Sequence, residues 1–286
     1  MRQRRLVAAA ITLITVATVA GQVPGSATAA PGDVYVALGD SYTAGPLIPN
    51  QIEPYGCLKS DHDYPHVAAP IVQATTLRDV SCSGATTDHM FQTQNVWPAP
   101  NPPQLDAVDG ATTVVTLGIG GNDIGFSDIV QECVTWNPFA TPCRNRYLAG
   151  GVDQISQRIA AAAPKVASVL AAIHTRAPQA DVFVVGYPAI LPDTGYGCWP
   201  RLPIGWGDVP YLRAKEKELN TMLANQAAAG TASYVNTYTP SIGHDACASS
   251  GTRWVEPIIP ANPAAPVHPN GRGMTAIGGI VATAIG

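Results

Sequence analysis

The chain has 286 residues, a formal net charge of −4 and a charged-residue content of 13%. A typical soluble domain contains about 25% charged residues, so this sequence is poor in charge. It has 16 basic and 20 acidic residues and no basic stripe, which argues against nucleic acid as a partner. The length fits one large α/β domain, and no internal repeat or linker divides the chain.

The start of the chain is typical of a secretory signal peptide. Arginines precede the apolar stretch LVAAAITLITVATVA, and small residues follow it. The stretch has about 15 residues, fewer than the roughly 20 that cross a bilayer, so we expect no transmembrane anchor after signal removal. We place cleavage after Ala29, although Ala30 fits equally well. Residues 1–29 are then the signal, residues 30–286 form one domain, and the mature protein is secreted and extracellular.

Four apolar, β-branched runs predict buried strands. They are VYVALG from Val34, TTVVTLGIG from Thr112, ADVFVVGYP from Ala180 and ASYVNTY from Ala232. Their apolar residues are continuous rather than alternating, as in a parallel sheet covered on both faces. Helical patterns lie between them. The sequence therefore predicts an α/β fold, a three-layer α/β/α sandwich with a mostly parallel central sheet.

Three segments have helical periodicity. The first begins at Val152, and Pro164 within it predicts a kink or a division. The second begins at Pro210, which suits a first helical turn, and the third is NGRGMTAIGGIVATAI at the end of the chain. The connections are long and rich in the chain's 27 glycines and 26 prolines, and loops of this kind are usually functional or disordered.

The six cysteines form an even set in a chain predicted to leave the reducing cytosol, which indicates disulfides. Six cysteines allow 15 connectivities, and sequence alone does not choose among them. Pairing neighbours in chain order closes three separate loops, each worth roughly 2–4 kcal/mol. The pairs are then Cys57–Cys82, Cys133–Cys143 and Cys198–Cys247. A zinc site is disfavoured because paired C-x-x-C spacing is absent.

Three polar turns are candidates for a site. Ser41 in LGDSYTAG follows the first strand, where a capping or turn serine is more common than a nucleophile. Asn122 in GIGGND is either a turn residue or an amide aimed at a ligand, while Asp123 stands where a dinucleotide fingerprint requires glycine. Gly84 in SCSGATT either makes a turn or lets a backbone N–H approach a substrate.

The histidines supply candidates for a general base. His244 and His268 both follow the last predicted strand, and His268 immediately precedes the terminal helix. Position favours these two over the remaining histidines but does not separate them. The others are His62, His66, His89 and His174.

GDSYTAG, SCSGATT, GGND and a late HPN, in this order, resemble the motif blocks of the SGNH hydrolases, also called GDSL lipases and esterases. The sequence is most similar to the secreted actinobacterial branch with six cysteines. The blocks span essentially the whole mature chain, and four in order are far more specific than one. No G-x-S-x-G motif of the ordinary α/β-hydrolases is present.

The resemblance implies roles for four residues. Ser41 would be the nucleophile and His268 the base that removes its proton. The backbone N–H groups of Ser41 and Gly84 and the amide of Asn122 would form the oxyanion hole. A serine hydroxyl hardly ionises at neutral pH, so an imidazole with a pKa near 6.5 is needed to activate it.

The sequence departs from the family at one place. The family usually has D-x-x-H before the catalytic histidine, whereas Ala265 stands in the aspartate position of AAPVH. We expect the backbone carbonyl of Ala265 to orient His268, as in some relatives, with Asp245 and Glu256 as outside possibilities. A Ser41–His268 dyad is therefore favoured over a side-chain triad.

The predicted function is a secreted serine ester hydrolase, a lipase or esterase of lipid degradation that uses an acyl-serine intermediate. We expect no metal and no organic cofactor, ester or lipid substrates that include those at a lipid–water interface, and a monomer. Trp199, Trp206 and Tyr211 either line an acyl-binding cleft or pack a disulfide-pinned loop. The alternatives are a carbohydrate acetyl esterase, separable by its acyl-chain preference, and a catalytically silent extracellular binding module.

Overall fold

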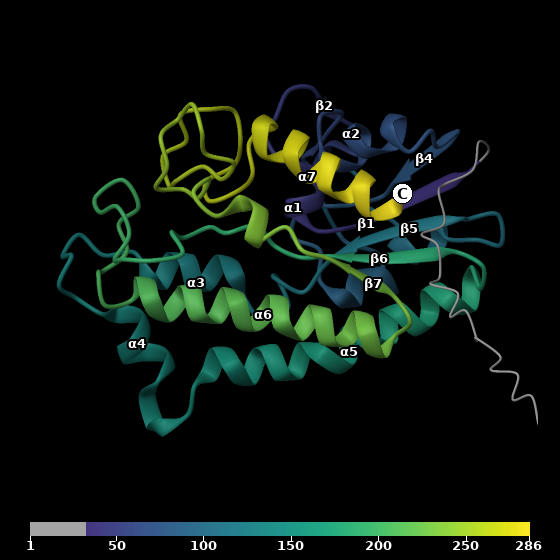
Figure 1. The fold of residues 1–286 in the computed structure, drawn as a ribbon. Helices are drawn as coiled ribbons and strands as arrows, with labels where there is room; N and C mark the ends of the chain where they lie inside the picture. Colours follow the sequence, from purple (N-terminus) through teal and green to yellow (C-terminus); the bar gives the residue numbers. More distant parts are fainter. Residues whose placement is uncertain (1–32) are drawn as a thin grey trace, which may run out of the picture.

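The computed structural model describes residues 33–286, and the predicted signal peptide, residues 1–29, lies outside the described residues. A five-stranded parallel sheet with strand order β4-β1-β5-β6-β7 forms the centre of the fold (Figure 1). Its strands are β1 (Val34–Gly39), β4 (Thr76–Asp79), β5 (Val114–Gly118), β6 (Asp181–Val185) and β7 (Ser233–Val235). The predicted fold class is confirmed.

Sequence reasoning predicted four of these strands and missed β4. The sequence of β4 is TLRD, a short and partly exposed segment at the edge of the sheet that lacks the long apolar run of a central strand. A small antiparallel pair, β2 (Gln51–Ile52) and β3 (Lys59–Ser60), was also missed because two-residue strands carry no periodicity.

Helices cover both faces of the sheet (Figure 1). α2 and α7 pack together over one face, and α5 and α6 pack together over the other. The helices are α1 (Ser41–Ala44), α2 (Tyr64–Ile71), α3 (Phe126–Cys133), α4 (Pro142–Tyr147), α5 (Gln154–Arg176), α6 (Val209–Ala229) and α7 (Gly271–Ile285). Short 3₁₀ turns are η1 (Tyr55–Cys57), η2 (Thr87–Met90), η3 (Gln104–Ala107), η4 (Ala149–Gly151) and η5 (Thr239–Ser241).

β1 shows why the strand sequences are continuously apolar. Tyr35 and Ala37 belong to the core beneath α2 and α7, while Val36 and Leu38 belong to the core beneath α5 and α6. Successive side chains of a strand point to opposite faces, and here both faces are covered. The sheet therefore buries every position of this strand after Val34, and the carboxyl end of the strand is held in a fixed place.

α5 does not divide at Pro164. The helix runs unbroken for 23 residues, so a division at this residue is excluded. Proline removes one helical N–H donor, yet the turns on both sides are anchored by buried residues that include Ile159 and Val166. Tertiary packing outweighs the local preference here.

All six cysteines are paired as neighbours in the chain. The bridges are Cys57–Cys82, Cys133–Cys143 and Cys198–Cys247, with sequence separations of 25, 10 and 49 residues. They fix loops that follow or flank the carboxyl ends of the strands. No helix within residues 33–286 is long and apolar enough to cross a membrane.

Candidate active site

The candidate site lies where the strand order reverses, between β1 and β5. Gly39 at the end of β1 is in register with Gly118 at the end of β5. Ser41 and Asn122 therefore emerge side by side at the carboxyl edge of the sheet, where open α/β sheets bind ligands. Asp40 caps α1 by accepting the backbone N–H of Tyr42 at 2.9 Å, which fixes Ser41 in the first helical turn.

Ser41 and His268 are in contact. The Nε2 atom of His268 lies 2.8 Å from the Oγ atom of Ser41. The Nδ1 atom lies 2.7 Å from the backbone carbonyl oxygen of Pro266. A carbonyl only accepts, so Nδ1 carries the proton and donates, which leaves Nε2 free to accept the hydroxyl proton of Ser41.

The expectation that the Ala265 carbonyl orients the imidazole is wrong. That carbonyl accepts the backbone N–H of His268 at 3.2 Å and closes a turn, whereas Nδ1 of the ring contacts the Pro266 carbonyl instead. Val267 has a φ of 61°, a left-handed conformation that is rare for a β-branched residue. This twist directs the ring of His268 to Pro266, two residues back in the chain.

Neither side-chain acid considered from the sequence reaches the imidazole. Asp245 accepts the backbone N–H of Cys247 at 2.9 Å. Glu256 forms an ion pair with Arg253 and accepts a hydrogen bond from Asn270, the N-cap of α7. Glu256 therefore braces the chain that carries His268 without touching its ring.

Tyr42 anchors the strained residue beside the histidine. Its hydroxyl donates to the carbonyl of Val267 at 2.6 Å, and its ring lies 5.0 Å from the imidazole of His268, centroid to centroid. Backbone conformations of this kind cost about 1–3 kcal/mol and persist only where the surroundings impose them. The hydrogen bond from Tyr42 supplies part of that constraint.

Burial shifts the titration of two groups at the site. Desolvation lowers the pKa of His268, and the hydrogen bond to the Pro266 carbonyl partly opposes this. The ring is therefore neutral at neutral pH, the form that a general base requires. Burial raises the pKa of Asp40 to about 7, although hydrogen bonds from Tyr187 and Tyr42 oppose the shift.

The Gly84 loop is hydrogen-bonded to Asn122, which lines the same cavity as Ser41. Within residues 33–286 the backbone N–H groups of Ser41 and Gly84 have no acceptor. The side-chain amide of Asn122 donates one hydrogen to the carbonyl of Ala85 at 2.8 Å, and an amide has a second hydrogen to offer. Gly84 has a φ of 80°, which a side chain would strain.

Sequence reasoning missed the residues that join these segments. The hydroxyl of Tyr187 donates to Asp40 at 2.5 Å and accepts the backbone N–H of Gly121 at 2.8 Å. Asp123 accepts hydrogen bonds from the backbone N–H and hydroxyl of Thr87. Asp40 precedes Ser41 and Asp123 follows Asn122 in the motif blocks, and this adjacency is the one sequence signal for the two aspartates.

An apolar cavity opens beside Ser41. It is a narrow cavity with a volume of about 100 Å³, and it opens to solvent. Ser41 and Asn122 line it, together with apolar side chains from α3, α5, α6 and the loop before α6, among them Ile129, Ile155, Leu202, Ile204, Leu212 and Leu219. Such a cavity accepts a hydrocarbon chain, with the hydroxyl of Ser41 at its polar end.

The three aromatic residues named from the sequence do not line this cavity. The indole N–H of Trp199 donates to the carbonyl of Thr135, and the hydroxyl of Tyr211 donates to Asp153. Trp206 packs edge-on against Phe139. Leucine and isoleucine from the same segment form the wall instead.

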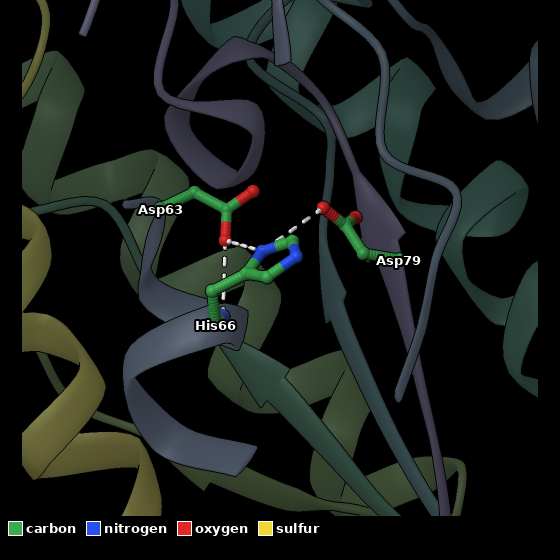
Figure 2. A group of neighbouring side chains, drawn as sticks. All are labelled: Asp63, His66 and Asp79. Atoms are coloured by element: carbon green, nitrogen blue, oxygen red, sulfur yellow. Dashed lines mark hydrogen bonds and ion pairs between the residues drawn. The ribbon is translucent and has the colours of Figure 1, made fainter. Parts of the chain in front are cut away.

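A second histidine belongs to a separate polar cluster. His66 lies between Asp63 and Asp79, with its Nδ1 atom 2.7 Å from Oδ1 of Asp63 and 3.9 Å from Oδ2 of Asp79 (Figure 2). Asp63 caps α2, and the ammonium of Lys59 donates to the backbone carbonyl of Asp79. Three such ligands suit a cation, but Lys59 already brings a positive charge to this cluster.

The comparisons with known proteins identify the family of the chain. The model of the GDSL-like lipase/acylhydrolase family matches residues 37–276. The chain belongs to this family. It is therefore an ester hydrolase of the GDSL type, as the motif blocks predicted.

Relatives come from Streptomyces. The chain is 39% identical to lipase 2 of Streptomyces coelicolor over 275 residues, 92% of this chain and 91% of that protein. It resembles the crystal structure of phospholipase A1 from Streptomyces albidoflavus with a TM-score of 0.73 and 25% identity, covering 88% of this chain and 98% of that one. An extracellular lipase from Streptomyces rimosus gives a TM-score of 0.66 at 26% identity, with coverages of 88% and 98%.

Proposed function

We propose that the protein is a secreted lipase or esterase that cleaves carboxylic esters of lipids through an acyl-serine intermediate, with Ser41 as nucleophile and His268 as base. The observation that carries the proposal is the 2.8 Å contact between Nε2 of His268 and Oγ of Ser41 at the mouth of an apolar cavity. The predicted signal peptide, the three disulfides and the extracellular relative support secretion.

Acylation begins with proton transfer. Nε2 of His268 takes the hydroxyl proton of Ser41 while Oγ bonds to the ester carbonyl carbon, and the carbonyl π electrons move to oxygen. The N–H groups of Ser41 and Gly84 and the amide of Asn122 bind the resulting oxyanion. Collapse breaks the bond to the alkoxy group, which leaves as the alcohol with the proton from His268.

Deacylation repeats the sequence with water. His268 removes a proton from water as its oxygen attacks the acyl carbon, the same donors bind the oxyanion, and collapse releases the carboxylic acid. Ser41 recovers the proton from His268. The imidazolium formed in each half is stabilised by the Pro266 carbonyl, a dipole rather than the full charge of a triad aspartate.

The cavity favours substrates with an extended acyl chain. Its exposed wall is mainly apolar, so each buried methylene contributes roughly 0.8 kcal/mol of binding. An acetyl group leaves this wall uncovered. We therefore place lipid acyl esters ahead of sugar acetates as substrates.

A panel of nitrophenyl esters from acetyl to palmitoyl tests the proposal. We expect kcat/KM to rise from acetyl to medium or long acyl chains, and Ser41→Ala to reduce kcat by roughly 10⁴-fold or more with an unchanged melting temperature. An inactive wild-type protein would refute the proposal, and a marked preference for acetyl would favour a carbohydrate acetyl esterase.

A further inference from the structure

Three aromatic side chains are exposed on two neighbouring loops, and we call them the aromatic patch: Trp136, Phe139 and Trp206. Their exposed fractions are 74%, 77% and 40%. The rings of Phe139 and Trp206 pack edge-on with centroids 5.0 Å apart. Single exposed apolar residues are ordinary, whereas large aromatic rings gathered in one place mark an interaction surface.

The backbone holds these rings outward. The loop that carries Trp136 and Phe139 is closed by the disulfide Cys133–Cys143. It is hydrogen-bonded to the segment of Trp206, through Thr135 N–H to the Pro203 carbonyl at 2.7 Å and Trp206 N–H to the Pro138 carbonyl at 2.8 Å. A close approach at Gly205 leaves no room for a Cβ atom, which would lie 1.9 Å from the Ala140 carbonyl oxygen.

The patch continues from the wall of the acyl cavity. Ile204 lines the cavity, and Trp206 follows two residues later. On the other loop, Val130 of α3 lines the cavity, and α3 leads directly to Trp136. Both loops lie at the end of the sheet where α1 begins (Figure 1). The same two segments therefore carry both the patch and part of the cavity wall.

Two arginines, Arg144 and Arg201, stand close to the patch residues in the sequence. Arg144 is exposed and forms no ion pair with the described residues. Arg201 donates only to backbone carbonyls, so its charge is not neutralised there. Arg146 is paired with Glu132, and the carboxylate of Asp208 is buried and accepts backbone N–H groups. Guanidinium groups on the segments that carry exposed aromatic rings suit the phosphates of lipid headgroups.

We propose that the aromatic patch docks on a phospholipid surface, with its rings at the boundary of headgroups and acyl chains and Arg144 and Arg201 at the phosphates. Tryptophan and phenylalanine favour this boundary, and the rigid loops lose little conformational freedom on docking. Docking places the cavity mouth at the surface, where an acyl chain enters it. This inference rests on the proposed function for its purpose, but lipid binding is measured separately from catalysis.

The test uses vesicles of phosphatidylglycerol and phosphatidylcholine in the Ser41→Ala background, which prevents hydrolysis during sedimentation. We expect the parent to bind and the added pair Trp136→Ser and Phe139→Ser to weaken partitioning at least tenfold. Trp97→Ser is the matched control, because Trp97 is 89% exposed but lies in a different loop, beside Gly56, and does not line the cavity. Thermal melting establishes that each variant is folded.

Three results would overturn the docking proposal: a parent that does not bind vesicles, a double variant that binds as the parent does, or an equal loss with Trp97→Ser. Hydrolysis of a soluble butyrate ester by the protein with Ser41 intact tests the proposed function instead. Loss of vesicle binding in the double variant with less than a twofold change in that soluble activity would support docking. A protein that binds vesicles through the patch but never hydrolyses esters would refute the proposed function alone.

Discussion

His66 and His268 occupy contrasting surroundings. His66 is the fourth residue of DYPH, which matches D-x-x-H, and it lies between the carboxylates of Asp63 and Asp79 (Figure 2). His268 has no carboxylate at its ring and is oriented by the carbonyl of Pro266. Yet only His268 contacts a serine hydroxyl. The comparison indicates that contact with the hydroxyl of Ser41, rather than a carboxylate partner, selects the candidate base.

Replacing each histidine with alanine gives the sharpest contrast. His268→Ala removes the proton acceptor of Ser41, so we expect kcat to fall roughly 10³-fold or more. His66→Ala leaves the site intact, and we expect less than a threefold change in kcat. The measurement is steady-state hydrolysis of a soluble butyrate ester by both folded variants. A similar loss of kcat in both variants would contradict the assignment of His268 as the base.

Asn122→Ala tests the anion-binding side of the site. Loss of one oxyanion donor typically reduces kcat by about 10²–10³-fold, less than the loss of the base. Asn122 also donates to the Ala85 carbonyl, so thermal melting is needed to separate catalysis from stability. Full activity in a folded Asn122→Ala variant would remove this residue from the proposed oxyanion hole.

Tyr42→Phe tests whether the neighbouring backbone positions His268. The substitution deletes the hydroxyl that donates to the carbonyl of Val267 at 2.6 Å and keeps the ring beside the imidazole. We expect roughly a tenfold loss in kcat and about 1 kcal/mol in the free energy of unfolding. Tyr64→Phe is the control, since its hydroxyl lies in the core away from Val267. Equal losses of kcat in both variants would argue against a positioning role.

The two environments also differ in their dependence on pH. Burial lowers the pKa of His268, so kcat should fall only as pH drops below about 6.5, where the imidazole gains a proton. Burial, and then repulsion from Asp79, raise the pKa of Asp63 well above its usual value. A carboxyl group whose pKa is raised on folding stabilises the folded state while it is protonated. Its contribution to the free energy of unfolding is therefore lost as pH rises above about 4.

Asp63→Asn should therefore change the pH dependence of stability without changing kcat. This is the smallest effect that we expect among these variants. Asparagine still caps α2 but carries no charge, so the variant should lose less stability than the wild type between pH 5 and pH 8. Asp63→Ala lacks the cap and should be about 1 kcal/mol less stable than Asp63→Asn. Chemical denaturation at the two pH values measures both. A pH dependence identical to that of the wild type would contradict the assignment of Asp63.

The central strands were predictable because burial on both faces leaves an apolar run, as in β1 and β5. α2 was missed because its sequence, YPHVAAPI, contains two prolines, one in the first turn and one near its end. Its stability comes from packing against α7, which no local pattern reveals.

The candidate site was predictable only in part. Ser41, Gly84, Asn122 and His268 could be named because their motifs resemble those of a known family. The role of the Pro266 carbonyl depends on the left-handed backbone of Val267, and valine gives no sequence signal for that conformation. Tyr187 and Asp40 are 147 residues apart, so their hydrogen bond has no local signature.

Labelling with a serine-directed phosphonate, followed by peptide mass spectrometry, shows whether Ser41 is the nucleophile and whether His268 activates it. We expect one adduct, on Ser41, formed at a similar rate in wild type and His66→Ala and at least 10²-fold more slowly in His268→Ala. An adduct on any other residue, or undiminished labelling of Ser41 without the imidazole of His268, would contradict these assignments.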